Sequence, residues 1–91
     1  MHVVVTTEHR GVFFGEADAA AVENDPIVLR NARMCVYWSN ETHGVVGLSV
    51  SGPQAGSRVT PAASRLVLRG VAAVMECTPE AIAAWESEPW S

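Results

Sequence analysis

Strand-type segments occupy most of this chain, and its strongest helix signal follows them. Residues 3–7 are β-branched throughout, which is typical of a β-strand. Thr78-Pro79-Glu80 has the order of a helix start, because threonine caps the first turn, proline suits the first helical position and glutamate meets the positive end of the helix dipole. Strands first and a helix last predict a mainly β fold, a small antiparallel β-barrel or roll with a short C-terminal helix over about residues 79–87.

The first two expected strands form a hairpin. Residues 12–17 return after a turn at residues 8–11, and Gly15 inside this second strand indicates a bulge or sharp bend. Residues 18–26 form a polar, alanine-rich connection with room for one helical turn at residues 19–22.

The middle of the chain favours further extended segments. Residues 27–38 predict one long strand, and Asn31-Ala32-Arg33 indicates a bend within it because twelve residues exceed the usual strand length of roughly 5–6. The remaining expected segments are a fourth strand at 45–50, a glycine-rich loop at 51–57, a short edge strand at 58–61, and strands at 65–69 and 71–77 joined at Gly70.

Length and charge limit the class of protein. The 91 residues predict one domain over residues 1–91, with its strands within 3–77. A formal net charge of −4 argues against a broad basic surface for duplex DNA. No apolar run reaches the roughly 18 residues of a membrane span, and the N-terminus lacks the pattern of a secretory signal. We therefore expect a small soluble protein of the cytoplasm with no membrane partner.

The basic residues and the cysteines each have a structural and a functional interpretation. All six basic residues are arginine, either through codon usage in a GC-rich genome or because guanidinium groups bind phosphate or carboxylate in a bidentate manner. Cys35 and Cys77 lie in apolar segments and are expected to be buried free thiols, with a disulfide between them as the alternative for which the sequence gives no signal. Neither these cysteines nor the three histidines have the spacing of zinc ligands, so no metal or other cofactor is predicted.

No catalytic motif is present in the sequence. It contains no nucleophile elbow, phosphate loop or dinucleotide fingerprint. Glu8-His9-Arg10 at the expected hairpin tip offers a general base, but an ordinary solvated turn explains it better. We therefore expect a protein that is not an enzyme, with a nucleotide hydrolase as the less favoured alternative.

The glycine-rich loop is the best candidate for an anion site. Gly52 and Gly56 allow backbone N–H groups to point into a common concavity, and Arg58 directly after the loop can close on a phosphate. An ordinary surface loop is the alternative, because the lysine and following helix of a phosphate-binding loop are missing.

The aromatic residues supply candidate contacts. Tyr37 and Trp38 are adjacent, so in a strand they face opposite sides. We expect Tyr37 in the core and Trp38 at the surface, where it covers an interface or stacks on a ligand ring. Trp85 on the helix is expected in the core or at a subunit contact. Trp90 near the end of the chain either docks on a neighbour or belongs to a loose tail.

Most of the chain resembles a family of small proteins of unknown function that is common in tailed-phage and prophage genomes. The residues that carry the resemblance are 3–15, 32–38, Gly52-Pro53 and 78–85. It implies a viral or prophage origin and no particular activity.

At the level of the fold, the chain also resembles Sm-like proteins, which are small ring-forming barrels that bind RNA. Residues 27–32 are similar to the first Sm motif, and residues 66–70 followed by 71–74 are similar to the second. The resemblance implies an SH3-type or Sm-type barrel in which Arg69 contacts the ligand and the connection at 18–26 lines the pocket.

Together these features predict a non-enzymatic binding module that forms a closed homo-oligomer. Its expected ligand carries phosphate and is a small nucleotide, such as a host-defence signal that the protein sequesters, or single-stranded RNA. In this hypothesis Arg58 and Arg69 contact phosphate and Trp38 stacks on a base, while Gly52 and Gly56 shape the loop. The alternative is a structural or protein-binding phage protein that acts in virion assembly or inhibits a host protein, which the acidic charge favours over RNA binding.

Overall fold

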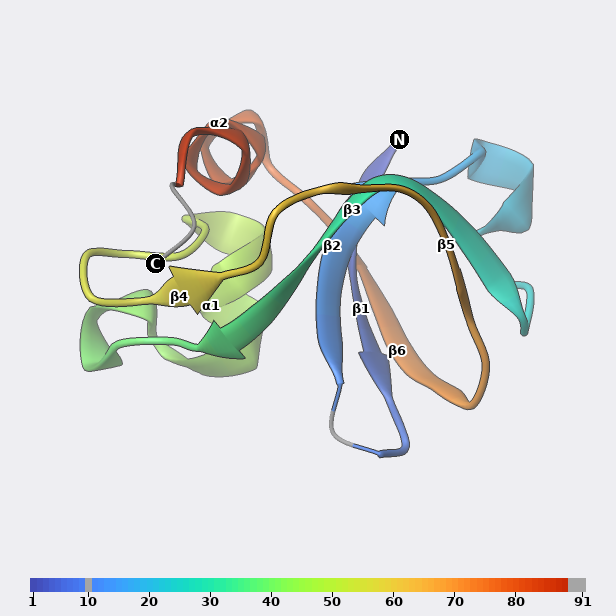
Figure 1. Ribbon diagram of the computed structural model, residues 1–91, viewed down its shortest axis with the longest axis horizontal. Coiled ribbons are helices and arrows are strands. Elements are labelled where there is room, and N and C mark those ends of the chain that lie inside the picture. The colour runs from blue at the N-terminus through green and yellow to red at the C-terminus, as the bar shows by residue number, and fades with distance from the viewer. Residues whose placement is uncertain (10, 89–91) are drawn as a thin grey trace.

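Six strands and two short helices make up the computed structural model, which describes residues 1–9 and 11–88 (Figure 1). The strands are β1 (His2–Thr7), β2 (Val12–Glu16), β3 (Ile27–Tyr37), β4 (Arg58–Val59), β5 (Ala63–Leu68) and β6 (Val71–Glu76). The helices are α1 (Gly44–Val50) and α2 (Pro79–Ser87), with single 3₁₀ turns η1 (Ala19–Ala21) and η2 (Asn40–Thr42). No helix in the described part of the chain is long and apolar enough to cross a membrane.

The strands form one antiparallel sheet that is not closed. Its order is β4-β3-β2-β1-β6, and β5 pairs with the first half of β3 while β4 pairs with its end. β5 and β6 diverge from the turn that joins them (Figure 1), and no pairing links them among the described residues. The prediction of a mainly β, antiparallel fold is confirmed. The predicted closed barrel is wrong, because β5 pairs with β3 and β6 pairs with β1, and the described residues of β5 and β6 do not pair with each other to close the sheet.

Strand β1 is buried on both faces, which explains its β-branched sequence. Val4 points to one side of the sheet and Val3 and Val5 point to the other, and each is at most 1% exposed. The Val4 side faces the helices, and its core cluster consists of Val4, Val12, Phe14, Cys35, Leu48, Val59, Cys77, Ala81 and Trp85. The other core cluster consists of Val3, Val5, Ala17, Ile27, Leu29, Ala32 and Leu68.

The predicted irregularities of β2 and β3 are present. The pairing of these strands shifts register between Phe14 and Glu16, on either side of Gly15. A Cβ atom at Gly15 would lie 2.9 Å from the Cβ of Leu29, so the close approach of the two strands requires glycine. Asn31 has a left-handed φ of 50°, which places the bend of β3 where the sequence indicated it.

Residues 45–50 form helix α1, so the predicted fourth strand is wrong. Leu48 is fully buried, and its carbonyl oxygen accepts a hydrogen bond of 2.9 Å from Nε1 of Trp85. Gly47 packs directly on the backbone of Thr42, because a Cβ there would lie 1.6 Å from the Thr42 carbonyl oxygen. A short apolar run does not distinguish a strand from a buried helical turn, and here packing between segments decides for the helix.

Helix α2 has the predicted bounds and start. The hydroxyl oxygen of Thr78 accepts a hydrogen bond of 3.1 Å from the backbone N–H of Ala81. Ala81 and Trp85 are fully buried, and the Trp85 ring stacks on Phe14 with centroids 5.0 Å apart. Trp85 is therefore a core residue, while the expected stop at Pro89 lies outside the described residues.

Candidate functional site

An open hollow of about 390 Å³ lies where β3 ends beside β4. We call it the Tyr37 hollow, and its lining residues are Val36, Tyr37, Gly56 and Arg58. The sheet itself brings the aromatic ring and the guanidinium together, because Tyr37 and Arg58 are paired in the register of β3 with β4. Two of the predicted ligand-binding residues, Gly56 and Arg58, therefore belong to one site.

Tyr37 is exposed rather than in the core, where the sequence had placed it. Tyr37 is 57% exposed and Val36 is 56% exposed. Trp38 is half-buried: it packs against the core and, with Val36 and Tyr37, also lines an open depression of about 260 Å³. The pairing of β3 with β4 is irregular between Cys35 and Tyr37. This irregularity breaks the alternation that would have placed Tyr37 on the buried side with Cys35. Of these two adjacent rings, Tyr37 is the more exposed and the one that lines the Tyr37 hollow.

The guanidinium of Arg58 is available for a ligand. Arg58 is exposed on the two-residue strand β4. Within residues 1–9 and 11–88, the ion pairs within 4.0 Å involve Arg30 and His2 but not Arg58. No carboxylate of the described residues is therefore already bound to this group when a phosphate approaches.

Gly52 does not share a concavity with Gly56. It is buried with φ 78°, and a Cβ atom there would lie 2.6 Å from the Cβ of Ala84 in α2. Its backbone N–H donates to the carbonyl oxygen of Gly47 at 3.1 Å. Gly52 thus allows the loop to pack against α2, and its N–H group is already used.

Arg69 lies in the turn between β5 and β6, toward the opposite end of the long axis from β4 (Figure 1). The next two backbone N–H groups, of Gly70 and Val71, each donate to the carboxylate of Asp25 at 3.2 Å. The structure therefore separates Arg69 from Arg58, and a single small ligand does not reach both.

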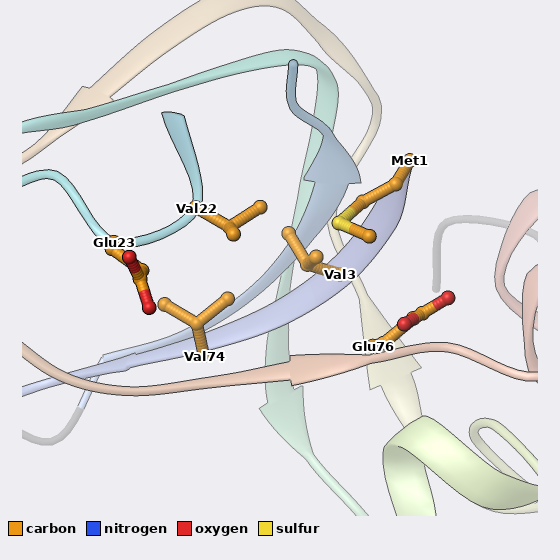
Figure 2. Close-up of a pocket in the computed structure, with 6 residues that line it drawn as sticks. All are labelled: Met1, Val3, Val22, Glu23, Val74 and Glu76. Atoms are coloured by element: carbon orange, nitrogen blue, oxygen red, sulfur yellow. The ribbon is translucent and has the colours of Figure 1, made fainter. Parts of the chain in front are cut away.

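A second hollow, of about 250 Å³, is lined by two glutamates and by apolar side chains. Figure 2 shows the carboxylates of Glu23 and Glu76 on two sides of the side chains of Val3, Val22 and Val74. Carboxylates repel phosphate, so this hollow does not suit the ligand class expected from the sequence.

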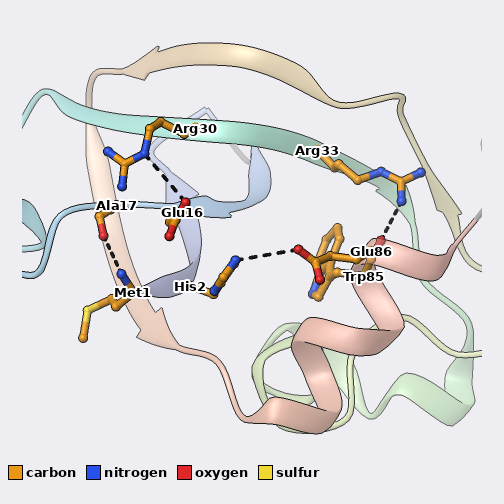
Figure 3. A network of polar contacts seen from close by, with 8 residues as sticks. All are labelled: Met1, His2, Glu16, Ala17, Arg30, Arg33, Trp85 and Glu86. Carbon is orange, nitrogen blue, oxygen red and sulfur yellow. Dashed lines mark hydrogen bonds and ion pairs between the residues drawn. The ribbon is translucent and has the colours of Figure 1, made fainter.

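A third hollow, also of about 250 Å³, contains residues that the sequence analysis did not select as ligand contacts. We call it the Arg33 hollow. Arg33 is only 8% exposed, and its Nε atom donates to the carbonyl oxygen of Thr60 at 2.7 Å. Its Nη1 atom donates to the carbonyl oxygen of Trp85 at 2.6 Å (Figure 3). Its lining residues are Phe14, Asn31, Arg33, Ala62 and Glu86.

One sequence signal for the Arg33 hollow was present. Arg33 is a charged residue inside an apolar strand, next to Ala32 and close to Cys35. Such a residue needs polar partners when it is buried. The partners come from Thr60 and Trp85, which lie 27 and 52 residues away along the chain.

The comparison with family models identifies the chain. The family described as "Domain of unknown function (DUF6948)" matches residues 1–85, which include all six strands. The chain belongs to the DUF6948 family. No curated protein and no solved structure matches it. Membership of a family of unknown function is thus confirmed, whereas the match carries neither the viral origin nor the Sm-like relationship expected from the sequence.

The two thiols of this DUF6948 domain are buried and free, as predicted. Burial raises the pKa of Cys35 to about 11. Burial, with a smaller contribution from the charge of Glu76, raises the pKa of Cys77 to about 12. Both cysteines are therefore protonated at neutral pH, which makes them poor nucleophiles.

Two further expectations concern segments of the chain that are only partly described. Glu8 and His9 are exposed at the β1–β2 turn, which agrees with an ordinary solvated turn. Arg10 of the same turn and Trp90, the expected docking residue, lie outside the described residues.

Proposed function

We propose that this domain is a binding protein whose Tyr37 hollow takes a small phosphate-bearing nucleotide. The observation that carries the proposal is the pairing of Tyr37 with Arg58 at one open hollow. An exposed aromatic ring stacks on a nucleobase, and a guanidinium binds phosphate in a bidentate manner. In a phage-encoded protein, such a site would sequester a host-defence nucleotide.

Size and charge support a small nucleotide over RNA. The hollow of about 390 Å³ falls in the range of about 300–1,000 Å³ that is typical of small-molecule sites. The formal net charge of −4 opposes a long polyanion, because each added phosphate must approach an acidic protein.

The lining of the Tyr37 hollow supports binding rather than turnover. Its lining side chains are valine, tyrosine and arginine, together with one glycine. None of these supplies a carboxylate, imidazole or thiol, the groups that most often act as general base or nucleophile. Compared with the sequence prediction, Tyr37 replaces Trp38 as the stacking ring, and Arg69 and Gly52 have no part in this site.

Self-association is the second part of the proposal. β5 and β6 each have one edge without a partner strand among the described residues. The only charged residue of β6 is Glu76, and strand edges with few charges tend to pair with another chain. Native mass spectrometry of the full chain tests this part, and we expect a single homo-oligomer. A monomer across the accessible concentration range would contradict it.

A protein partner is the second candidate function. Val36 and Tyr37 are large apolar side chains that remain more than half exposed at the same hollow, and such exposed apolar groups also mark protein contacts. This observation keeps virion assembly or inhibition of a host protein as the alternative.

A nucleotide titration tests the first candidate. The probes are adenosine monophosphate, guanosine monophosphate, ribose 5-phosphate, adenosine and inorganic phosphate, each titrated into the full chain by calorimetry. We expect a monophosphate to bind, Arg58→Ala to weaken it roughly tenfold, and Tyr37→Phe to retain more affinity than Tyr37→Ala.

Arg69→Ala is the matched control, because it removes the same charge at the other end of the molecule. The proposal requires that this variant bind like the unmodified chain. It is wrong if Arg69→Ala and Arg58→Ala weaken binding equally, or if no probe binds. A stable complex with a host protein that Tyr37→Ala disrupts would then favour the second candidate.

A further inference from the structure

The Arg33 hollow contains a positive and a negative side chain that do not pair with each other. Arg33 and Glu86 both line it, yet the ion pairs within 4.0 Å among the described residues include none between them. The carboxylate of Glu86 instead lies 3.8 Å from Nε2 of His2 (Figure 3). Two opposite charges are thus held apart on the wall of one hollow.

The positive side of this hollow is a buried charge without a counter-ion in the part of the chain that the structure describes. Arg33 is 8% exposed, and its two hydrogen bonds reach neutral carbonyl oxygens of Thr60 and Trp85. These bonds fix the orientation of the guanidinium but do not neutralise it. The structure shows no acceptor, within its described residues, for the remaining N–H groups of Arg33. Because a buried unpaired charge is unfavourable, an anionic group that binds there is stabilised.

The negative side excludes a simple anion as the occupant. Glu86 lines the same hollow and repels an inorganic anion, just as Arg33 repels a simple cation. A ligand that carries both charges meets an attractive partner on each side. Asn31 adds an amide that both donates and accepts hydrogen bonds.

We propose that the Arg33 hollow binds a free zwitterion of amino-acid size, with its carboxylate on Arg33 and its ammonium group on Glu86. The volume of about 250 Å³ lies below the range of about 300–1,000 Å³ of pockets for larger ligands. A peptide carries its terminal amine and carboxylate at distant ends, so a free amino acid fits this charge pair better. The proposal does not depend on the Tyr37 hollow.

A titration followed by ¹H–¹⁵N NMR of the full chain tests this inference at constant ionic strength. The probes are glycine and 4-aminobutanoate, which are zwitterions with short and long charge spacing, together with acetate and methylammonium, which carry one charge each. We expect one zwitterion to shift the amide signals of Asn31, Arg33 and Glu86 saturably, with a dissociation constant roughly tenfold lower than that of acetate or methylammonium.

Glu86→Gln and Glu80→Gln form a matched pair of variants. Both residues are exposed on α2, but only Glu86 lines the hollow. Glu86→Gln should abolish the preference for the zwitterion over acetate, while Glu80→Gln, which changes the net charge equally, should keep it. The inference is wrong if acetate binds the unmodified chain as tightly as both zwitterions, if the two variants behave alike, or if no probe saturates.

Discussion

The guanidinium of Arg33 in β3 donates a hydrogen bond of 2.6 Å to the carbonyl oxygen of Trp85 in the last part of α2. Carbonyl oxygens near a helix C-terminus lack partners within the helix, and a cationic donor there also meets the negative end of the helix dipole. A second bond, to the Thr60 carbonyl oxygen, ties in the segment after β4. One side chain thus joins the sheet to the C-terminal helix.

Replacement of Arg33 should therefore destabilise the fold. Arg33→Met leaves two carbonyl oxygens without their donors, and we expect the free energy of unfolding to fall by about 2 kcal/mol. Urea denaturation monitored by tryptophan fluorescence measures it. Arg30→Met is the control, because Arg30 is half-exposed and its ion pairs among the described residues are with the surface carboxylates of Glu16 and Asp18, so its loss should cost less than about 1 kcal/mol. Equal effects of the two variants would contradict the joining role.

Gly52 and Gly44 separate the cost of packing from the cost of backbone conformation. Both have positive φ, 78° and 80°, but a Cβ at Gly52 meets Ala84 at 2.6 Å, whereas a Cβ at Gly44 meets nothing within 4 Å. Gly44→Ala should cost about 1 kcal/mol for the left-handed backbone alone. Gly52→Ala should cost about 2–4 kcal/mol because it also pushes α2 away. Thermal unfolding of both variants tests this, and a smaller loss for Gly52→Ala would refute the contact.

Local signals were sufficient for much of the fold. The β-branched run of residues 3–7 and the Thr78-Pro79-Glu80 start predicted β1 and α2, because in both places neighbouring residues alone determine the element. Residues 45–50 were different, since Leu48 is held in a helix by burial and by the hydrogen bond from Trp85. That contact spans 37 residues, and nothing in the local sequence reports it.

The candidate sites also differ in whether a local sequence signal or a contact between distant residues defines them. Arg58 and Gly56 were found because one glycine-rich loop precedes one exposed arginine in sequence. Tyr37 was missed as the exposed ring, since the irregular pairing near Cys35 changes the side on which it lies. The Arg33 hollow was missed because its lining comes from β2, β3, the segment after β4 and α2, which meet only in the folded chain.

The N-terminal cap of α2 predicts that the stability of the fold depends on the hydroxyl group of Thr78. Its hydroxyl oxygen accepts from the Ala81 N–H at 3.1 Å and donates to the Val50 carbonyl oxygen at 2.5 Å. Thr78→Ala should lower the free energy of unfolding by about 1–2 kcal/mol. Thr78→Ser keeps the hydroxyl group and should stay within about 0.5 kcal/mol of the unmodified chain in the same urea experiment. A serine variant as unstable as the alanine variant would show that the hydroxyl group is not the cause.

The buried thiols predict a loss of stability in alkali. Burial raises the pKa from 9.0 to about 11 for Cys35 and to about 12 for Cys77, so the folded chain keeps protons that the unfolded chain releases above pH 9. The stabilisation is fully present below pH 9 and is lost as the pH rises toward 11–12. We expect the free energy of unfolding to fall by about 3 kcal/mol between pH 9 and about 10.5, because each of the two thiols contributes to the slope.

The cysteine variants isolate this effect from other alkaline titrations. Cys35→Ala with Cys77→Ala removes both thiols, so the curve of unfolding free energy against pH should become flatter above pH 9, even if the packing loss lowers it at every pH. Urea denaturation at a series of pH values gives both curves. If the slope above pH 9 is the same with and without the thiols, other groups cause the alkaline loss, because only a group whose pKa differs between the folded and unfolded chains contributes to that slope.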